Sequence, residues 1–423
     1  MPDVRPLRAL HYDLKTAGPL DRLIAPPYDV IDAAGREELA GRAHNVVHLD
    51  LPDDPAGGDR YARAAALLAQ WRADGVLVHD ERPALWALEQ RFNDPDGKQR
   101  TRRGVLARIR ADPYAAAGVR PHERTQPGPK ADRLALTRAT RANLSPIFAL
   151  HSDPQRAVAG ALEPHMTGEP WAEATDAQGT QQRLWRVGDP TSIRTACGAL
   201  AASPLLIADG HHRYETARAY ADEVGGEGPH RYVLALLVAL EDPGLAVFPT
   251  HRLLHSLGAD GRGALRAAID RDWLVEPVEP EMLVPPPPQP GRPLQIGYLD
   301  AFQRRPLRLT LRDQEVADRA LPGRSRAFRR LDTAVVEALL LRNALGRSEE
   351  EIARKHGLDY ARSFAEARQR LETGAAEVAL FMAPTPVELV QAIARDGESM
   401  PPKSTFFYPK VPTGLLISPL DAE

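Results

Sequence analysis

The chain has 423 residues, of which 43% are hydrophobic and 26% are charged, and its formal net charge at pH 7 is −3. These values are typical of a globular protein with room for two or three domains, and they disfavour a protein that binds mainly nucleic acid, which usually carries a positive charge. The single cysteine, Cys197, excludes an internal disulfide framework and a thiolate zinc cluster.

The first residues, MPDVRPLRAL, lack the apolar region of a signal peptide. The sequence contains no apolar run of about 18 residues, which is the length that predicts a transmembrane helix. We therefore expect a cytoplasmic protein with no membrane partner.

The N-terminal part predicts short elements of both kinds. A strand over residues 4–12 precedes APPYDVI at 25–31, where two prolines fix an extended loop that presents Tyr28 and Asp29. The alternative is a rigid connector whose tyrosine packs on the core. Further along, the patterns predict a helix at 33–43, a strand at 46–51, a helix at 59–74 and a β-hairpin at 84–110.

The second polar stretch is GVRPHERTQPGPKADRL at 118–134. Its prolines and glycines predict an irregular loop, and such loops often carry function when a rigid scaffold holds them. His122 and Glu123 could supply a general base, with Arg124 and Thr125 beside them. Lys130 could face an anion just before a helix at 131–143, which a buried strand at 145–150 follows.

The central stretch is PLLIADGHHRYETARAY at 204–220. It predicts a buried strand at 205–208, a turn at Asp209-Gly210 and a helix at 211–223. The cations His211, His212 and Arg213 at the helix N-terminus oppose the helix dipole, so they favour a bound phosphate. The alternative is a corner of solvated polar residues.

The remaining patterns predict paired strands at 171–175 and 182–187, a helix at 190–201 and a buried strand at 230–240. We expect a main domain at 1–276, a proline-rich linker or excursion at 277–293, and a C-terminal α+β part at 294–423. In that part we expect paired strands at 294–299 and 306–311 and a helix at 331–345.

The last motif, MPPKSTFFYPK at 400–410, would pack back onto the main domain. Lys403, Ser404 and Thr405 could donate to a phosphate, although the glycines of a P-loop are absent. Only six residues are lysines, and Lys130, Lys403 and Lys410 all fall in motifs, which suggests that these positions need a compact ammonium group.

Four motifs together resemble the domain-of-unknown-function family 1015, namely APPYDVI, PHERTxPGPKxDRL, IADGHHRYETA and MPPKSTFFYPK. The DGHHR turn also resembles the phosphate-contacting turn of the ParB/sulfiredoxin-like fold, which includes DNA-partition CTPases, sulfiredoxin and free-serine kinases. We expect an α/β or α+β fold with mixed sheets and a ParB/sulfiredoxin-like substructure around residues 200–240. The family pattern implies a strand and a helix over 348–371, where the spacing alone would allow a helix-turn-helix.

These features predict a nucleotide-dependent phosphotransferase acting on a small hydroxylated metabolite, and the free-serine kinases make an amino acid such as serine a candidate. Mg²⁺ would enter with a nucleoside triphosphate or diphosphate, since no protein-only metal cluster is evident. The predicted phosphate-binding residues are Gly210, His211, His212, Arg213, Lys130, Lys403, Ser404 and Thr405. The predicted catalytic residues are Glu123, Asp209 and His122. The predicted substrate-binding residues are Tyr28, Asp29, Arg124, Thr125, Glu215 and Lys410.

Two alternatives stay open. One is a ParB-like, nucleotide-gated DNA-binding or partition module, which the balanced charge disfavours. The other is a non-catalytic phosphate- or nucleotide-binding protein with the same anion site.

Overall fold

The computed structural model describes the chain except residues 54–57, 96, 126, 290 and 422–423, so parts of the predicted hairpin turn, of the second motif and of the proline-rich stretch lie outside the described residues. The chain divides into two compact units, neither of which is continuous in sequence. Unit 1 comprises Met1–Pro121, Thr125–Leu245 and Pro409–Glu423, and unit 2 comprises His122–Arg124 and Ala246–Tyr408.

Unit 1 contains a nine-stranded sheet with the order β6-β11-β8-β12-β5-β4-β10-β9 and with β1 beside β5. Its strands are β1 (Val4–Arg5), β4 (Leu85–Asn93), β5 (Gln99–Arg110), β6 (Val119–Arg120), β8 (Ile147–His151), β9 (Ala172–Thr175), β10 (Gln181–Val187), β11 (Leu205–Asp209) and β12 (Tyr232–Ala239). β11 runs parallel to β6, and β12 runs parallel to β8, whereas β4 and β5 form the predicted antiparallel hairpin. The mixed sheet confirms the predicted fold class, and the ParB/sulfiredoxin-like substructure stays a prediction.

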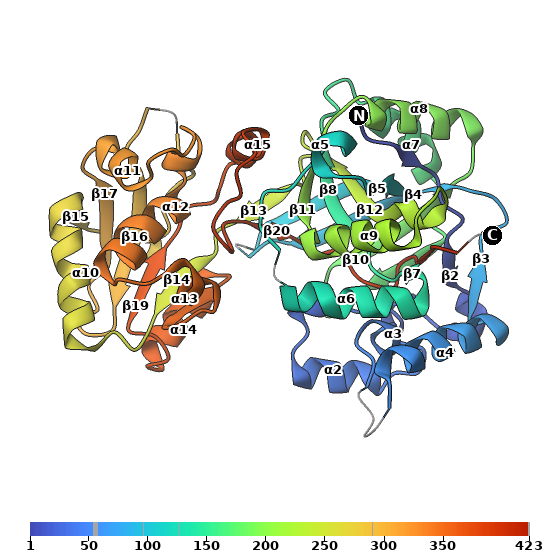
Figure 1. Ribbon diagram of the computed structural model, residues 1–423, viewed down its shortest axis with the longest axis horizontal. Coiled ribbons are helices and arrows are strands. Elements are labelled where there is room, and N and C mark those ends of the chain that lie inside the picture. Colours follow the sequence, from blue (N-terminus) through green and yellow to red (C-terminus); the bar gives the residue numbers. More distant parts are fainter. Residues whose placement is uncertain (54–57, 96, 126, 290, 422–423) are drawn as a thin grey trace. The chain divides into compact units, whose positions relative to one another are not determined.

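Helices cover one face of this sheet. α7 (Ala157–Leu162), α8 (Pro190–Ala201) and α9 (His211–Val224) pack in one apolar core with alternate residues of the strands. Val105, Ala107 and Ile109 of β5 reach this core because side chains of a strand alternate between its two faces. α6 (Pro127–Thr140) packs beside α9 and α4 (Arg60–Ala73) (Figure 1).

The remaining elements of unit 1 are small. They are the strand pairs β2 (Leu10–Tyr12) with β3 (Leu77–His79) and β7 (Ala142–Asn143) with β21 (Ser418–Pro419), and the helices α1 (Leu14–Ala17), α2 (Ala33–Ala40), α3 (Val47–Asp50) and α5 (Tyr114–Ala117). The pairing of β21 with β7 places the C-terminal segment within unit 1.

Unit 2 is built on a six-stranded sheet with the order β15-β17-β16-β19-β14-β18. Its strands are β14 (His251–Leu254), β15 (Trp273–Pro277), β16 (Gln295–Asp300), β17 (Leu307–Leu311), β18 (Leu358–Ala361) and β19 (Val378–Phe381), with β13 (Ala246–Phe248) and β20 (Phe406–Tyr408) as a separate pair. Its helices are α10 (Gly258–Asp272), α11 (Gln314–Ala320), α12 (Asp332–Val336), α13 (Glu349–Ala353), α14 (Phe364–Glu372) and α15 (Val387–Arg395). α12 continues as a π-helical segment, Glu337–Ala344.

The domain boundary that we predicted at 277–293 does not coincide with the division into units. The proline-rich stretch joins β15 to β16, and both strands pair with β17 in one sheet. Leu283 of this stretch lies against β16, because a Cβ atom at Gly297 would clash with the Leu283 carbonyl oxygen. Residues 277–293 are therefore an excursion within unit 2 rather than a linker.

Three local predictions were wrong. Residues 46–51 form the helical turn α3 instead of a strand, because the Asn45 side chain accepts a hydrogen bond from the backbone N–H of Val47. The strand at 4–12 is interrupted and forms β1 and β2. The second motif is less irregular than predicted, since α6 begins at Pro127, where a proline fits the first turn of a helix.

The structure also tests the two interpretations of residues 348–371. Residues 349–372 contain the strand and helix that the family pattern implied, after the short helix α13. None of the helices in the part of the chain that the structure describes has the length and apolar character needed to cross a bilayer.

Candidate functional site

The predicted strand, turn and helix of the central stretch are present as β11, Gly210 and α9. Gly210 has a φ of 91°, a conformation that glycine adopts without the steric penalty of a Cβ atom. Because the N-cap is this glycine, no N-cap side chain occupies the first N–H groups of α9. His211 is buried and His212 is half-buried in the first turn. The positive end of the α9 dipole lies at this N-terminus and favours a negative charge nearby.

A half-buried carboxylate, Asp209, lies immediately before this N-terminus. Lys410 and Arg213 both form ion pairs with it, the latter at 2.7 Å. Burial alone would raise the pKa of Asp209, but the two cations outweigh burial and hold the pKa well below its usual range. The side chains of Lys410 and Asp209 are 21% and 15% exposed, so solutes can reach this ion pair.

Arg213 already donates hydrogen bonds to three groups of unit 1. Its guanidinium donates to the carbonyl oxygen of Pro146, to the hydroxyl of Ser145 at 2.7 Å and to Asp209. A Cβ atom at Gly210 would lie 3.0 Å from its Nε, so the guanidinium packs over that glycine. These contacts tie the start of α9 to the segment before β8, and they favour an anchor over the predicted phosphate ligand.

The first motif joins the same neighbourhood through Tyr28. The guanidinium of Arg133 lies 4.4 Å from the centre of the Tyr28 ring, and burial raises the pKa of Tyr28 to about 12. Arg133 also pairs with the buried carboxylate of Asp50 at 3.0 Å. Tyr28, Asp50, Arg133 and Arg213 line one small pocket of about 40 Å³.

The second and fourth motifs also meet the central stretch. Lys130 of α6 lies 3.5 Å from Glu215 of α9, and Lys410 pairs with Asp209. All four motifs therefore contribute residues to one cluster at the N-terminal half of α9 within unit 1. We call Tyr28, Asp50, Lys130, Arg133, Asp209, Gly210, Arg213, Glu215 and Lys410 the motif cluster.

Several other predicted site residues belong to unit 2. His122 is buried and its Nε2 lies 3.0 Å from the hydroxyl of Thr405. The Ser404 hydroxyl donates to the carbonyl oxygen of Pro401 at 2.7 Å and contacts the Thr333 hydroxyl at 2.8 Å. The hydroxyls of Ser404 and Thr405 therefore have partners in the fold of unit 2.

Lys403 is exposed and has a φ of 56°, and its carbonyl oxygen accepts from the buried Arg252 at 3.1 Å. Glu123 is half-buried, and its negative charge opposes the effect of burial, which lowers the pKa of Arg252. Arg124 is exposed, and in unit 1 Asp29 is exposed and Thr125 is half-buried. Within the described ranges, no three His, Cys, Asp or Glu residues are grouped as a metal ion would require.

The sequence reasoning missed two parts of unit 1. Asp50 belongs to the motif cluster and Ser145 accepts a hydrogen bond from its Arg213, and neither residue lies in a motif. A cavity of about 480 Å³ lies against β4, β5, β12 and α7, and none of the predicted site residues lines it. Its polar residues come from several strands and from the loops and helix beside them, and they carry no local signature in the sequence.

Comparisons with known proteins place the chain within a family. Residues 4–334 match the family described as "Protein of unknown function (DUF1015)". No curated protein matches the chain.

Similar solved structures include a conserved hypothetical protein from Pyrococcus furiosus, with 14% identity over 73% of this chain and 93% of that chain and a TM-score of 0.36. A free serine kinase in complex with AMP has 13% identity over 73% and 92% of the two chains, with a TM-score of 0.36. C-terminally truncated SbnI from Staphylococcus aureus has 11% identity over 74% and 87%, with a TM-score of 0.37. Because these TM-scores are all below 0.5, the likenesses carry no argument about activity.

Proposed function

The chain belongs to the DUF1015 family, whose description assigns no activity, and we propose that it is a nucleotide-dependent phosphotransferase acting on a small hydroxylated metabolite, of which serine is one candidate. The phosphates would bind at the N-terminus of α9 in unit 1. The observation that carries this proposal is the motif cluster, in which a reachable lysine, Lys410, lies beside a helix N-terminus that no N-cap side chain occupies.

The backbone N–H groups of His211 and His212 would donate to the phosphate oxygens. Lys410 would neutralise them, because a phosphate group can compete with Asp209 for the ammonium. Arg213 would keep its contacts with Ser145 and Pro146 and hold the start of α9 in place. The protein's contribution would thus be positioning and charge neutralisation, which dominate phosphoryl transfer.

Asp209 suits a metal ligand better than a general base. A base should have a pKa near the working pH, and Lys410 and Arg213 hold the pKa of Asp209 below its usual range. Mg²⁺ keeps several waters and needs only one or two carboxylates, so Asp209, once Lys410 contacts phosphate, fits that requirement. Magnesium bound with the nucleotide would neutralise charge on the phosphates.

The roles of Glu123 and His122 as bases, and of Lys403, Ser404 and Thr405 as phosphate ligands, stay predictions. The same holds for Asp29, Arg124 and Thr125 as substrate ligands. Glu215 is held by Lys130 at 3.5 Å and by Arg218 at 3.3 Å, so we assign it to positioning α6 against α9.

Thermal shift is the first test of nucleotide binding. The purified protein is screened with magnesium and ATP, ADP, CTP, GTP, pyrophosphate or phosphate. At a hundredfold excess over its Kd, a ligand stabilises by about 2.7 kcal/mol. That energy raises the Tm of a domain of 150–250 residues by roughly 5–10 °C.

The matched variants are Lys410→Met and Lys98→Met, the latter an exposed lysine of the β4–β5 turn. We expect the shift to fall in the first and persist in the second. Stabilisation by CTP alone would favour the partition-like alternative. The absence of any shift would refute nucleotide binding. Nucleotide binding without nucleotide consumption, in the presence of serine and a panel of hydroxylated metabolites, would favour the non-catalytic alternative.

A further inference from the structure

The cavity of about 480 Å³ in unit 1 lies apart from the motif cluster. Its volume is within the usual range for small-molecule sites, about 300–1,000 Å³. In the sheet Asp209 of β11 lies opposite Phe148 of β8, whereas His151, three residues further along β8, lines the cavity. At about 3.3 Å per residue these positions are roughly 10 Å apart, and the cavity shares no residue with the motif cluster.

The floor of the cavity is apolar. Val105 of β5 and Leu237 of β12 face it from the sheet, and Leu162 and Met166 close it from α7 and the turn that follows. Gly104 of β5 also lines the cavity. This surface suits the apolar body of a small molecule.

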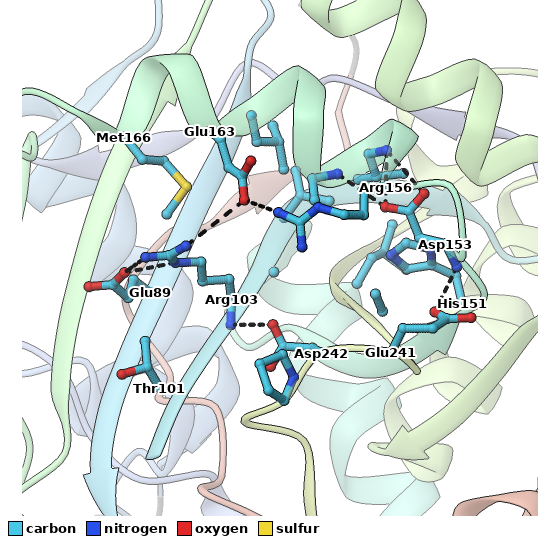
Figure 2. Close-up of a pocket in the computed structure, with 18 of the residues that line it drawn as sticks. Glu89, Thr101, Arg103, His151, Asp153, Arg156, Glu163, Met166, Glu241 and Asp242 are labelled. Carbon is cyan, nitrogen blue, oxygen red and sulfur yellow. Dashed lines mark hydrogen bonds and ion pairs between the residues drawn. The ribbon is translucent and has the colours of Figure 1, made fainter. Parts of the chain in front are cut away.

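The arginines around the cavity already have carboxylate partners (Figure 2). Arg103 pairs with Glu89 at 2.8 Å, and Arg91 pairs with the same carboxylate at 2.9 Å. Arg156 pairs with Glu163. Each arginine that lines this rim therefore has a carboxylate partner within the chain, and Glu89 is shared by Arg91, Arg103 and Arg183.

The carboxylates at the opposite end are different. Glu241 accepts hydrogen bonds from the Ser152 hydroxyl at 2.9 Å and from the Asp153 N–H at 2.8 Å. Asp242 accepts hydrogen bonds from the backbone N–H groups of Arg103 and Gly244. Neither forms an ion pair with a residue that the structure describes.

Two features indicate that the polar groups at this end of the cavity would gain from a cationic hydrogen-bond donor. Burial raises the pKa of Asp242 despite the nearby arginines, so a further cation beside it would be favourable. The Nδ1 atom of His151 is buried at the same end and has no hydrogen-bond partner among the described residues. Burial also lowers the pKa of His151, so its ring stays neutral and adds no positive charge. Figure 2 shows His151 and Glu241 close together at one side of the cavity.

We propose that this cavity binds a primary amine carried on an apolar body, with the protonated amine between Glu241, Asp242 and His151 and the body on Val105, Leu237 and Leu162. An amine supplies the positive charge that the two carboxylates lack. The site would act independently of nucleotide binding at α9.

The test is isothermal titration at pH 7 with three amines, hexylamine, phenethylamine and tryptamine. Hexanol, 2-phenylethanol, hexanoate and 3-phenylpropanoate serve as neutral and anionic analogues. We expect at least one amine to bind with a Kd of 1 mM or tighter, and at least tenfold more tightly than its neutral analogue. Failure of all three amines, or equal binding of alcohols or carboxylates, would overturn the proposal.

Variants locate the binding. Glu241→Gln should weaken amine binding at least fivefold, and Glu169→Gln, an exposed glutamate outside the cavity, should leave it unchanged. Ala159→Phe should fill the cavity and abolish binding. Amine binding that survives both Glu241→Gln and Ala159→Phe would place the ligand elsewhere and refute the site. If Ala159→Phe lowers the Tm, Glu241→Gln, at an exposed position, decides the question alone.

Discussion

Unit 1 contains two polar regions that are organised in opposite ways. In the motif cluster, carboxylates and cations are paired with one another, as Asp209 is with Lys410 and Arg213. At the cavity the arginines are paired with carboxylates, but within the described part of the chain the hydrogen-bond donors to Glu241 and Asp242 are neutral. A dense polar motif can therefore indicate an internal network of ion pairs as well as a ligand site. Carboxylates without an ion-pair partner, in contrast, can occur where the sequence has no motif.

Arg213→Ala is the substitution with the largest expected effect, and it tests whether the charges of the motif cluster form a structural network. It removes three donated hydrogen bonds and leaves Asp209 with one cation, so we expect a loss of about 3–5 kcal/mol in the free energy of unfolding. Denaturant unfolding measures this loss. Arg194→Ala, at an exposed position on α8, is the control and should change stability by less than about 0.5 kcal/mol. Equal effects of the two substitutions would show that Arg213 is not an anchor.

Lys410→Met removes one of the two cations paired with Asp209 and leaves the ion pair between Asp209 and Arg213 in place. We expect a loss of about 1.5–3 kcal/mol at pH 7. The lowered pKa of Asp209 stabilises the fold above the unfolded pKa of about 3.9, and this stabilisation is lost as the pH falls toward the folded value. The stability difference between wild type and variant should therefore narrow below about pH 4. A difference that stays constant from pH 7 to pH 2.5 would contradict the role of Lys410.

Gly210→Ala tests the turn that connects β11 to α9. With φ at 91° an alanine is strained by about 1–2 kcal/mol, and its Cβ would press on the Arg213 guanidinium. Thermal unfolding should show this loss. Gly198→Ala in α8, where a Cβ has open space, should instead stabilise by about 0.5–1 kcal/mol.

The smallest effect is expected at the cavity. Glu241→Gln should change the free energy of unfolding by less than about 0.5 kcal/mol, because Glu241 is exposed and has no charged partner among the described residues. A loss above 1 kcal/mol in denaturant unfolding would mean that Glu241 is part of a structural network like that of Asp209, and the contrast would fail.

The sequence predicted the elements that periodicity and turn chemistry determine. The β4–β5 hairpin and the β11–Gly210–α9 turn followed from alternation, a turn signal and helical spacing. Residues 46–51 did not, because the short helix α3 depends on contacts of the Asn45 side chain with a distant segment.

The sequence predicted the site only in part. The four motifs identified Asp209, Lys130 and Lys410, but no local pattern shows that Arg213 donates to Ser145, which is 68 residues away in the chain. The cavity could not be predicted, because Glu89, His151 and Asp242 come together only through the order of the strands in the sheet.

The most direct measurement is a crystal structure of the protein with magnesium and ADP. The proposal predicts the diphosphate within hydrogen-bond distance of the N–H groups of His211 and His212, with Lys410 turned from Asp209 to the phosphates and Arg213 unmoved. A diphosphate bound elsewhere, or Lys410 still paired with Asp209 beside bound ADP, would contradict the proposal.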